Sequence, residues 1–355
     1  MRKPTTRFGM TNSLYHASLV RDGYSPFSYS SLFSIIKGGI LMNYSIILNR
    51  HAGNGNAEKA WATIKPLLDQ QQIDYHMETT KYPNHGEYLA SQIAQSHSAA
   101  SSIVIAIGGD GTLHQVVNGL MKTAKQLDKA PLPVGYIPAG TGNDFARAYG
   151  ISLHPHQALN QILTANKSQF INIGHYHEAI RGEDGYFLNN LGIGFDAAIV
   201  SRANTFKSRH KKNHIGRFTY LQKAIGVMYD QEPFTLMIQQ DRKRFIFPKA
   251  YIAIASNHPF IGGGFRVAPH ASLTKPSLEL VVAERKNWPL TTWQLLQLTR
   301  GKLDQSRFAH HFQGNNLHIT TTSLEFSQTD GEEMGNRFID IALNITQYPI
   351  WQTRK

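Results

Sequence analysis

The chain has 355 residues, of which 41% are hydrophobic and 10% aromatic, and its formal net charge is +12. It has no cysteine, which excludes a disulfide scaffold and thiolate catalysis and fits a reducing, intracellular setting. The length predicts two domains, and the positive charge favours an anionic partner: nucleic acid, a membrane or a phosphorylated substrate. No apolar run approaches the roughly 18 residues that a membrane-spanning helix needs.

Residues 1–41 differ from the rest, because they are rich in Ser, Tyr and Arg and show neither helical nor strand periodicity. We expect this segment to be disordered, either as a leader or as the product of a gene start placed too far upstream. A purine-rich stretch like a bacterial ribosome-binding site would encode Lys37-Gly38-Gly39, which favours Met42 as the first residue of the working protein. The intact mass of the natively expressed protein would decide between these readings.

A unit of strand, glycine loop and helix repeats three times after Met42. The apolar runs Tyr44–Asn49, Ile103–Ile107 and Leu132–Ile137 predict strands, and they lead into the turn sequences HAGNGN, GGDGT and PAGTGND. Helical periodicity follows each turn. The pattern predicts a parallel α/β sheet whose loops lie together at the carboxyl ends of the strands, where such sheets bind ligands.

Beyond about residue 150 the sequence becomes β-rich, which predicts a mostly antiparallel second domain. A helical stretch near residues 218–228 interrupts the β runs, and a last strand is expected at Arg337–Leu343. The other predicted strands are Phe170–His175, Tyr186–Leu191, Phe234–Gln239, Phe245–Ala255, Leu278–Ala283, Leu317–Thr321 and Ser323–Phe326.

The GGDGT loop can serve either as a helix entry or as a phosphate site. A loop that enters a helix presents free backbone N–H groups, and glycine lets a phosphate approach them closely. Asp110 adds a carboxylate, which beside a phosphate needs a divalent cation or a hydroxyl proton to accept, and both are tasks in phosphoryl transfer. The structural alternative is a helix capped by Asp110 or Thr112.

The remaining motifs each allow a structural and a chemical reading. PAGTGND (138–144) offers Thr141 and Asn143 as neutral donors and Asp144 as a helix N-cap. TDGEE (329–333) gathers carboxylates before the last strand, although Asp-Gly is also a common hairpin turn. The basic stretch SRHKKNHIGR (208–217) is either a solvated loop or a contact for an anionic membrane, and we expect no nucleic-acid partner. The histidines form no metal-ligand pattern, so no resident metal site is expected.

Taken in order, the motifs resemble those of the bacterial diacylglycerol kinase-like lipid kinases, relatives of the sphingosine kinases. The matching segments are IGGDGTLHQVVNGL, PAGTGNDFARA, NNLGIGFDA, SNHPFIGGGFRVAP and TDGEE, and the resemblance covers about residues 42–352. It implies a Rossmann-like α/β nucleotide-binding domain (42–148 and about 338–355) and an antiparallel β-sandwich domain for the lipid (149–337). The nucleotide would lie in the cleft between these domains.

By resemblance, Glu332 corresponds to the general base, Asp110 to its partner at the metal–phosphate end, and Asp330 to a further acid of the same motif. ATP with Mg²⁺ is the implied cofactor. The implied nucleotide contacts are Asn49, Thr80, Gly108, Gly109, Asp110, Gly111, Thr112, Leu113, His114 and Thr141.

The chain departs from the family pattern in two places. His114 and Gln115 stand where the family often has Asn and Glu, in GGDGTLHQV. The family's accessory Mg²⁺ site uses carboxylates after an Ile-Ala-Pro segment, but no acid occurs here from Ala268 to Leu278.

These observations predict an ATP-dependent lipid kinase that acts on diacylglycerol or a similar lipid at the cytoplasmic face of an anionic membrane. A soluble-metabolite kinase of the NAD kinase type would account for GGDGT alone. A catalytically weak regulator that binds nucleotide or lipid would account for the two departures. The sequence leaves homodimer formation open.

Overall fold

A computed structural model of the protein describes residues 36–37, 40–194, 197–198, 232–303 and 306–354, all within one unit, Phe33–Lys355. The basic stretch 208–217, the predicted helix near 218–228 and residues 1–35 lie outside the described residues. Of the expected leader, the structure describes β1 (Ile36–Lys37) and β2 (Ile40–Leu41), which pair antiparallel.

The first part of the unit is a parallel α/β sheet, as predicted. Its strands are β3 (Asn43–Leu48), β4 (Tyr75–Thr79), β5 (Ser102–Gly108) and β6 (Val134–Pro138), in the order β6-β5-β3-β4. All residues of β5 and β6 are buried, as expected for parallel strands covered on both faces. The predicted strand Leu132–Ile137 corresponds to β6, which lies between β5 and the C-terminal strand β19.

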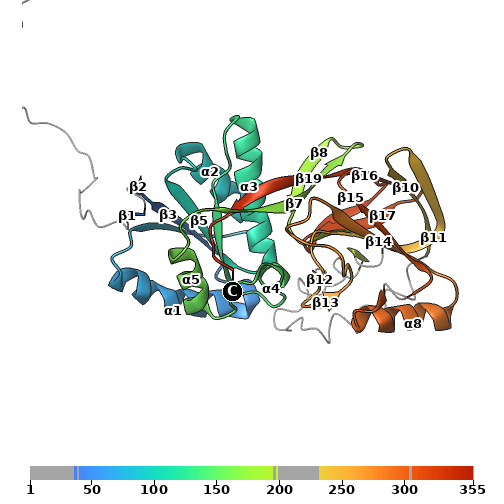
Figure 1. Ribbon diagram of the computed structural model, residues 1–355, viewed down its shortest axis with the longest axis horizontal. Coiled ribbons are helices and arrows are strands. Elements are labelled where there is room, and N and C mark those ends of the chain that lie inside the picture. Colours follow the sequence, from blue (N-terminus) through green and yellow to red (C-terminus); the bar gives the residue numbers. More distant parts are fainter. Residues whose placement is uncertain (1–35, 38–39, 195–196, 199–231, 304–305, 355) are drawn as a thin grey trace, which may run out of the picture. The chain divides into compact units, whose positions relative to one another are not determined.

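Helices cover both faces of this sheet (Figure 1). α1 (Asn56–Gln70) follows the short 3-10 turn η1 (Ala52–Gly55) and packs with α5 (Pro155–Leu163). α2 (His85–Ser96) packs with α3 (Asp110–Gln126). A further short helix, α4 (Asp144–Tyr149), follows the PAGTGN loop. The two pairs lie on opposite faces, since right-handed crossovers in the order β6-β5-β3-β4 require it.

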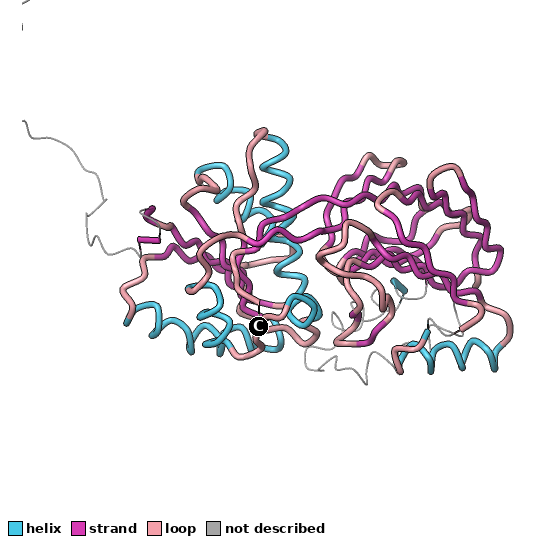
Figure 2. Tube along the Cα trace, in the orientation of Figure 1, coloured by secondary structure: helices cyan, strands magenta, loops and turns pink. Residues whose placement is uncertain are grey.

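The second part is an antiparallel β-sandwich, which confirms the predicted fold class, and Figure 2 shows it as mostly strand. Its strands belong to a mixed sheet that includes the parallel strands and runs β18-β17-β9-β11-β10-β16-β19-β6. Outside this order, β14 pairs with β11 and β15, and β7 pairs with β19 and β8. The strands are β7 (Gln169–Glu178), β8 (Glu183–Phe187), β9 (Asn190–Gly194), β10 (Phe234–Gln240), β11 (Lys243–Ser256), β14 (Leu278–Glu284), β15 (Ala309–Gly314), β16 (Leu317–Thr321), β17 (Glu325–Thr329), β18 (Glu332–Arg337) and β19 (Asp340–Ile350). A separate hairpin joins β12 (Phe260–Ile261) and β13 (Phe265–Arg266).

One strand connects the two parts of the unit. β19 pairs with β16 through Asp340–Leu343 and with β7 along its length, and its last residue, Ile350, pairs parallel with Val134 of β6. The buried amide of Gln352 then continues this edge, because it accepts from Tyr136 N at 2.9 Å and donates to Tyr136 O at 3.0 Å. The C-terminal segment thus extends the α/β sheet beside β6.

Two local expectations were wrong, and one helix was missed. The run Tyr186–Leu191 is split between β8 and β9, because the backbone at residues 188–190 binds a carboxylate at the candidate site instead of pairing as one strand. The run Arg337–Leu343 is divided between β18 and β19, since Arg337 pairs with Glu325 of β17 whereas Asp340 pairs with Thr320 of β16. α8 (Trp288–Thr299) was not predicted.

Within the described residues, no helix has the length and apolarity required to cross a membrane.

Candidate active site

The glycine loops at the carboxyl ends of β3, β5 and β6 pack directly against one another. A Cβ on Gly140 would lie 2.6 Å from the Cα of Gly109, and a Cβ on Gly53 would overlap the carbonyl oxygen of Ala139. Gly53 also has a φ of 58°, which favours glycine. Close packing therefore explains several of these glycines, and it brings the backbones of the three predicted loops to one place.

Asp110 joins two of these loops. Its Oδ2 accepts a hydrogen bond from Asp144 N and its Oδ1 accepts one from Phe145 N, both at 3.1 Å. The carboxylate therefore caps α4 from a distance of 34 residues in the sequence, rather than its own helix. The N-cap of α4 is Asn143, in the left-handed region, and Asp144 is the first helical residue, so the N-cap assignment of Asp144 was wrong by one position.

Asp144 ties α4 to the hairpin of β12 and β13. Its Oδ2 accepts from Gly263 N at 2.8 Å, and its Oδ1 accepts from Arg147 Nη1 at 2.7 Å. Burial first, and then the charge of the Asp144 carboxylate, raise the pKa of Asp110 from 3.8 to about 7, against the two backbone N–H groups that lower it. An acid with this pKa changes its charge near neutral pH.

The TDGEE motif forms a hairpin turn between β17 and β18. Asp330 and Gly331 have φ values of 50° and 86°, as a two-residue type I′ turn requires. The Asp330 carboxylate accepts from the backbone N–H groups of Leu188, Asn189 and Asn190 at 2.8, 2.8 and 3.0 Å. The structural reading of the motif, a hairpin turn, is thus confirmed, and the Asp330 carboxylate binds backbone within the protein.

His114 connects this turn to α3. Its Nδ1 lies 2.9 Å from Asp330 Oδ2, and the Asp330 side chain is fully buried. Burial acts to lower the pKa of His114, but the hydrogen bond to Asp330 and the charges of Asp330, Glu332 and Glu87 together raise it above its ordinary value. Because the oxygens of Asp330 are occupied by four donors, the geometry suits this residue to holding the β17–β18 turn on α3.

Glu332 lies over the start of α3. Its Oε1 accepts a hydrogen bond of 2.6 Å from Gln115 Nε2 and lies 3.7 Å from the position of a Cβ on Gly111. Gln115 Nε2 is also 3.4 Å from Asn84 Oδ1. The chain thus brings an acid from β18 to the GGDGT loop across more than 200 residues of sequence.

The residues implied as nucleotide contacts are arranged around the same strand ends. Asn49 Nδ2 donates to Thr112 Oγ1 at 3.1 Å, and Thr80 follows β4, where its N–H donates to Leu48 O. Thr141 is exposed in its loop. Leu113 differs, because its side chain is fully buried in the α/β core and its N–H donates to Gly109 O. Only its backbone faces the loop.

The segment implied as an accessory Mg²⁺ site does not fit that ion. Residues 268–278 carry no acid, and the nearest carboxylate, Glu279, is 1% exposed. Its two oxygens accept from His270 N and from His311 Nδ1, both at 2.8 Å. Among the described residues, no three or more His, Asp or Glu side chains are grouped to hold a metal ion. Mg²⁺ bound to a nucleotide needs fewer ligands from the protein, since phosphate oxygens and water molecules supply the others.

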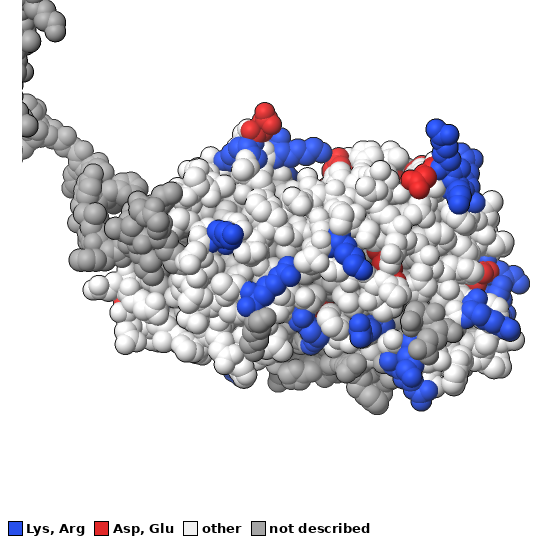
Figure 3. Space-filling model, viewed as in Figure 1, with Lys and Arg blue, Asp and Glu red and all other residues white. Residues whose placement is uncertain are grey.

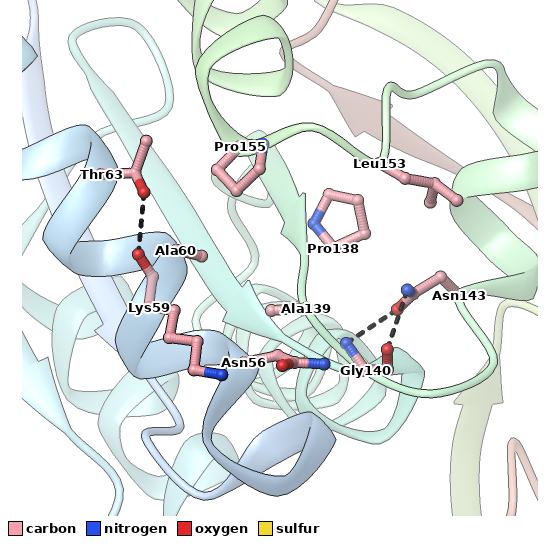
Figure 4. Close-up of a pocket in the computed structure, with 10 residues that line it drawn as sticks. All are labelled: Asn56, Lys59, Ala60, Thr63, Pro138, Ala139, Gly140, Asn143, Leu153 and Pro155. Carbon is pink, nitrogen blue, oxygen red and sulfur yellow. Dashed lines mark hydrogen bonds between the residues drawn. The ribbon is translucent and has the colours of Figure 1, made fainter. Parts of the chain in front are cut away.

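A cavity of about 270 Å³ opens beside the PAGTGN loop on the α1 side of the sheet (Figure 4). Asn56, Lys59 and Thr63 contribute its polar groups from α1, and Pro138, Leu153 and Pro155 contribute apolar surface. Sequence reasoning missed this cavity, and it missed the contacts of Gln115 with Glu332 and of Asp144 with Gly263. No local signal could have revealed them, because each joins segments far apart in the chain.

Comparisons with known proteins found relatives of both parts of the unit. The chain matches the family model "Diacylglycerol kinase catalytic domain" over residues 43–175 and the model "YegS C-terminal NAD kinase beta sandwich-like domain" over residues 189–343. The boundary between the matches falls near the point where the parallel sheet gives way to antiparallel strands.

Individual relatives and one solved structure are similar to this chain over most or much of its length. The "Putative lipid kinase YtlR" of Bacillus subtilis is 29% identical over 301 residues, covering 83% of this chain and 94% of that protein. A Staphylococcus aureus protein named "Putative lipid kinase SAB0675c" is 26% identical over 221 residues, covering 61% of this chain and 66% of its own length. A crystal structure titled as a "putative diacylglycerol kinase" from Bacillus anthracis shares the fold, with a TM-score of 0.66, 19% identity and coverage of 88% of this chain and 97% of that one.

Proposed function

We propose that this chain, which belongs to the diacylglycerol kinase-like family of lipid kinases, transfers the γ-phosphate of ATP to diacylglycerol and so forms phosphatidic acid. One observation supports this most strongly: Glu332 of β18 lies over Gly111 of the GGDGT loop. A carboxylate at the mouth of a phosphate-binding loop is the arrangement that in-line phosphoryl transfer to a hydroxyl requires.

In the proposed reaction the backbone N–H groups of the glycine loops bind the phosphates of ATP at the start of α3. Asn49 and Thr112 brace this loop through their side-chain hydrogen bond, and the exposed Thr141 offers a hydroxyl from the neighbouring loop. Mg²⁺ bound with the nucleotide would neutralise phosphate charge, and the carboxylates of Asp110 and Glu332 would hold it.

Glu332 acts as the general base. It accepts the proton of the lipid hydroxyl while that oxygen forms a bond to the γ-phosphorus and the bond from the γ-phosphorus to the β–γ bridging oxygen breaks, which releases ADP. Gln115 orients Glu332 through the 2.6 Å hydrogen bond. Asp110 holds α4 and the loop after β6 in register with the phosphate site, and Asp330 and His114 hold the turn that carries Glu332.

The experiment is transfer of labelled phosphate from ATP by the purified full chain to a panel of acceptors: diacylglycerol, monoacylglycerol, a long-chain amino alcohol and NAD. The proposal predicts label in phosphatidic acid. Label in the dinucleotide alone would instead identify a soluble-metabolite kinase. ATP binding without transfer to any acceptor would identify a nucleotide-binding regulator and overturn the proposal.

A further inference from the structure

Helix α8 buries two of its polar side chains and exposes three of its large apolar ones, Trp288, Trp293 and Leu296. Thr291 and Gln294 are 0% and 1% exposed, whereas Trp293 is 50% exposed and Leu296 is 39% exposed. Gln294 is held by the protein, because its Oε1 accepts from Tyr251 Oη at 3.2 Å and its Nε2 lies 3.5 Å from Ser306 Oγ. A surface helix normally has the opposite arrangement, so the exposed apolar side marks an interaction surface.

Cationic side chains flank this apolar side, and one of them, Lys286, pairs with Glu284 just before the helix at 3.2 Å. The segment Arg285–Leu303 contains two arginines and two lysines and no Asp or Glu. Arg285 lies over the ring of Trp288, with its Cζ 4.2 Å from the ring centroid, and Arg300 and Lys302 are exposed just after the helix. Figure 3 shows Lys and Arg side chains along the α8 edge of the molecule. Tryptophan together with lysine and arginine suits the interface between an anionic lipid headgroup layer and its hydrocarbon.

The same helix is connected to the candidate active site by a single hairpin. α8 contacts β13, and the glycine loop of the β12–β13 hairpin donates its Gly263 N–H to Asp144. Asp144 in turn donates its own N–H to Asp110. In Figure 1, α8, the β12–β13 hairpin and α4 lie along one edge of the molecule. A membrane in contact with α8 would therefore lie along the same edge of the molecule as the β12–β13 hairpin and α4.

We propose that the exposed side of α8, defined here as Trp288, Trp293 and Leu296 with Arg300 and Lys302, docks the protein on an anionic bilayer. This inference rests on the proposed function, because a lipid kinase must reach a substrate held in a membrane. The aromatic and aliphatic side chains enter the headgroup region, and the cations pair with lipid phosphates. The helix lies in the interface and does not span it.

Vesicle sedimentation tests the docking directly. The full chain is mixed with vesicles of phosphatidylcholine containing phosphatidylglycerol, and with vesicles of phosphatidylcholine alone. We expect binding to the anionic vesicles, which weakens as salt rises. Trp293→Ser with Leu296→Ser should weaken that binding roughly tenfold or more, because each side chain loses its apolar transfer. Arg300→Glu with Lys302→Glu should remove the preference for anionic lipid.

Phe170→Ser is the matched control, because Phe170 is 63% exposed on β7, away from α8 in the fold, and its loss should leave vesicle binding unchanged. Circular dichroism and the unfolding midpoint check that the α8 variants remain folded. Unchanged vesicle binding of both double variants would overturn the proposal. So would a shift from dimer to monomer in the α8 variants with vesicle binding retained, since a second copy of the chain would then cover this side.

A second readout separates the docking from the proposed function. A short-chain diacylglycerol that is soluble as a monomer needs no membrane contact. The α8 variants should phosphorylate it at the rate of the unaltered chain and should lose activity only on diacylglycerol held in vesicles. Loss of activity on both substrates would contradict a docking role for α8, whereas failure of the unaltered chain on both would refute the proposed function and leave the vesicle-binding result standing.

Discussion

Gln115 donates a hydrogen bond of 2.6 Å to Oε1 of Glu332, although 217 residues separate them in the sequence. The amide is a donor without a charge, so it orients the carboxylate and leaves it able to accept a proton. A glutamate at position 115, which the family often has, could make this contact only if the two carboxylates shared a proton.

Gln115→Glu should therefore move the acid limb of the pH dependence of kcat/KM to higher pH, because two carboxylates at hydrogen-bond distance resist ionising together. Gln115→Met is the matched control, since it removes the donor without adding a charge, and it should lower kcat with a smaller displacement of the profile. A Gln115→Glu profile that overlays that of the unaltered enzyme would show that Gln115 does not act on the base.

The free energy of unfolding should depend on pH through the protonation of Asp110. Its folded-state pKa of about 7 lies above the ordinary 3.8, so its protonated form favours folding. This contribution is complete below about pH 4 and is lost as the pH rises through 7, with a slope of at most about 1.4 kcal/mol per pH unit. Asp110→Asn should remove that slope between pH 5 and 8, as measured by urea unfolding.

Asp144→Asn provides an independent check on the cause of the shift. After burial, the Asp144 carboxylate is the largest cause that raises the Asp110 pKa, so its neutralisation should move the Asp110 inflection to lower pH. The observable is the position of the inflection and not the absolute stability, because the variant also alters the contact with Gly263. An inflection that stays at the same pH would assign the shift to burial alone.

Asp330→Ala should destabilise the fold by about 3 kcal/mol or more, because it leaves three backbone N–H groups and His114 without their acceptor. Chemical denaturation measures the loss. Asp184→Ala is the control: this carboxylate is 40% exposed and pairs with His175 on the surface, so its removal should cost less than about 1 kcal/mol. Equal losses in the two variants would refute the anchoring role of Asp330.

The α/β part of the fold could be predicted because its chemistry is local. A parallel strand covered on both faces must be apolar along its length, as Ser102–Gly108 is, and the loop that follows needs glycine where other backbones approach. β4 escaped prediction since its five residues, YHMET, are only partly buried and carry no clear alternation. α8 escaped it because apolar residues lie both on its exposed side, as Trp293 does, and against the core, as Leu298 does, so the pattern of a surface helix is absent.

The candidate site was predictable only in its parts. GGDGT and TDGEE each stand out as motifs, but nothing in their spacing places Glu332 over Gly111 or His114 against Asp330. The resemblance to lipid kinases indicated which residues of these motifs to consider, but only the folded structure shows their hydrogen-bond partners. These partners support the roles that we propose for the two acids, in which Glu332 acts on the substrate and Asp330 has both carboxylate oxygens engaged within the protein.

The central claim is that Glu332 takes the proton of a lipid hydroxyl at the GGDGT loop, and Glu332→Gln tests it most directly. The variant keeps the shape of the side chain, so ATP affinity measured by calorimetry should stay within about twofold, while transfer to diacylglycerol should fall by about 100-fold or more. Transfer at the rate of the unaltered chain would contradict the account.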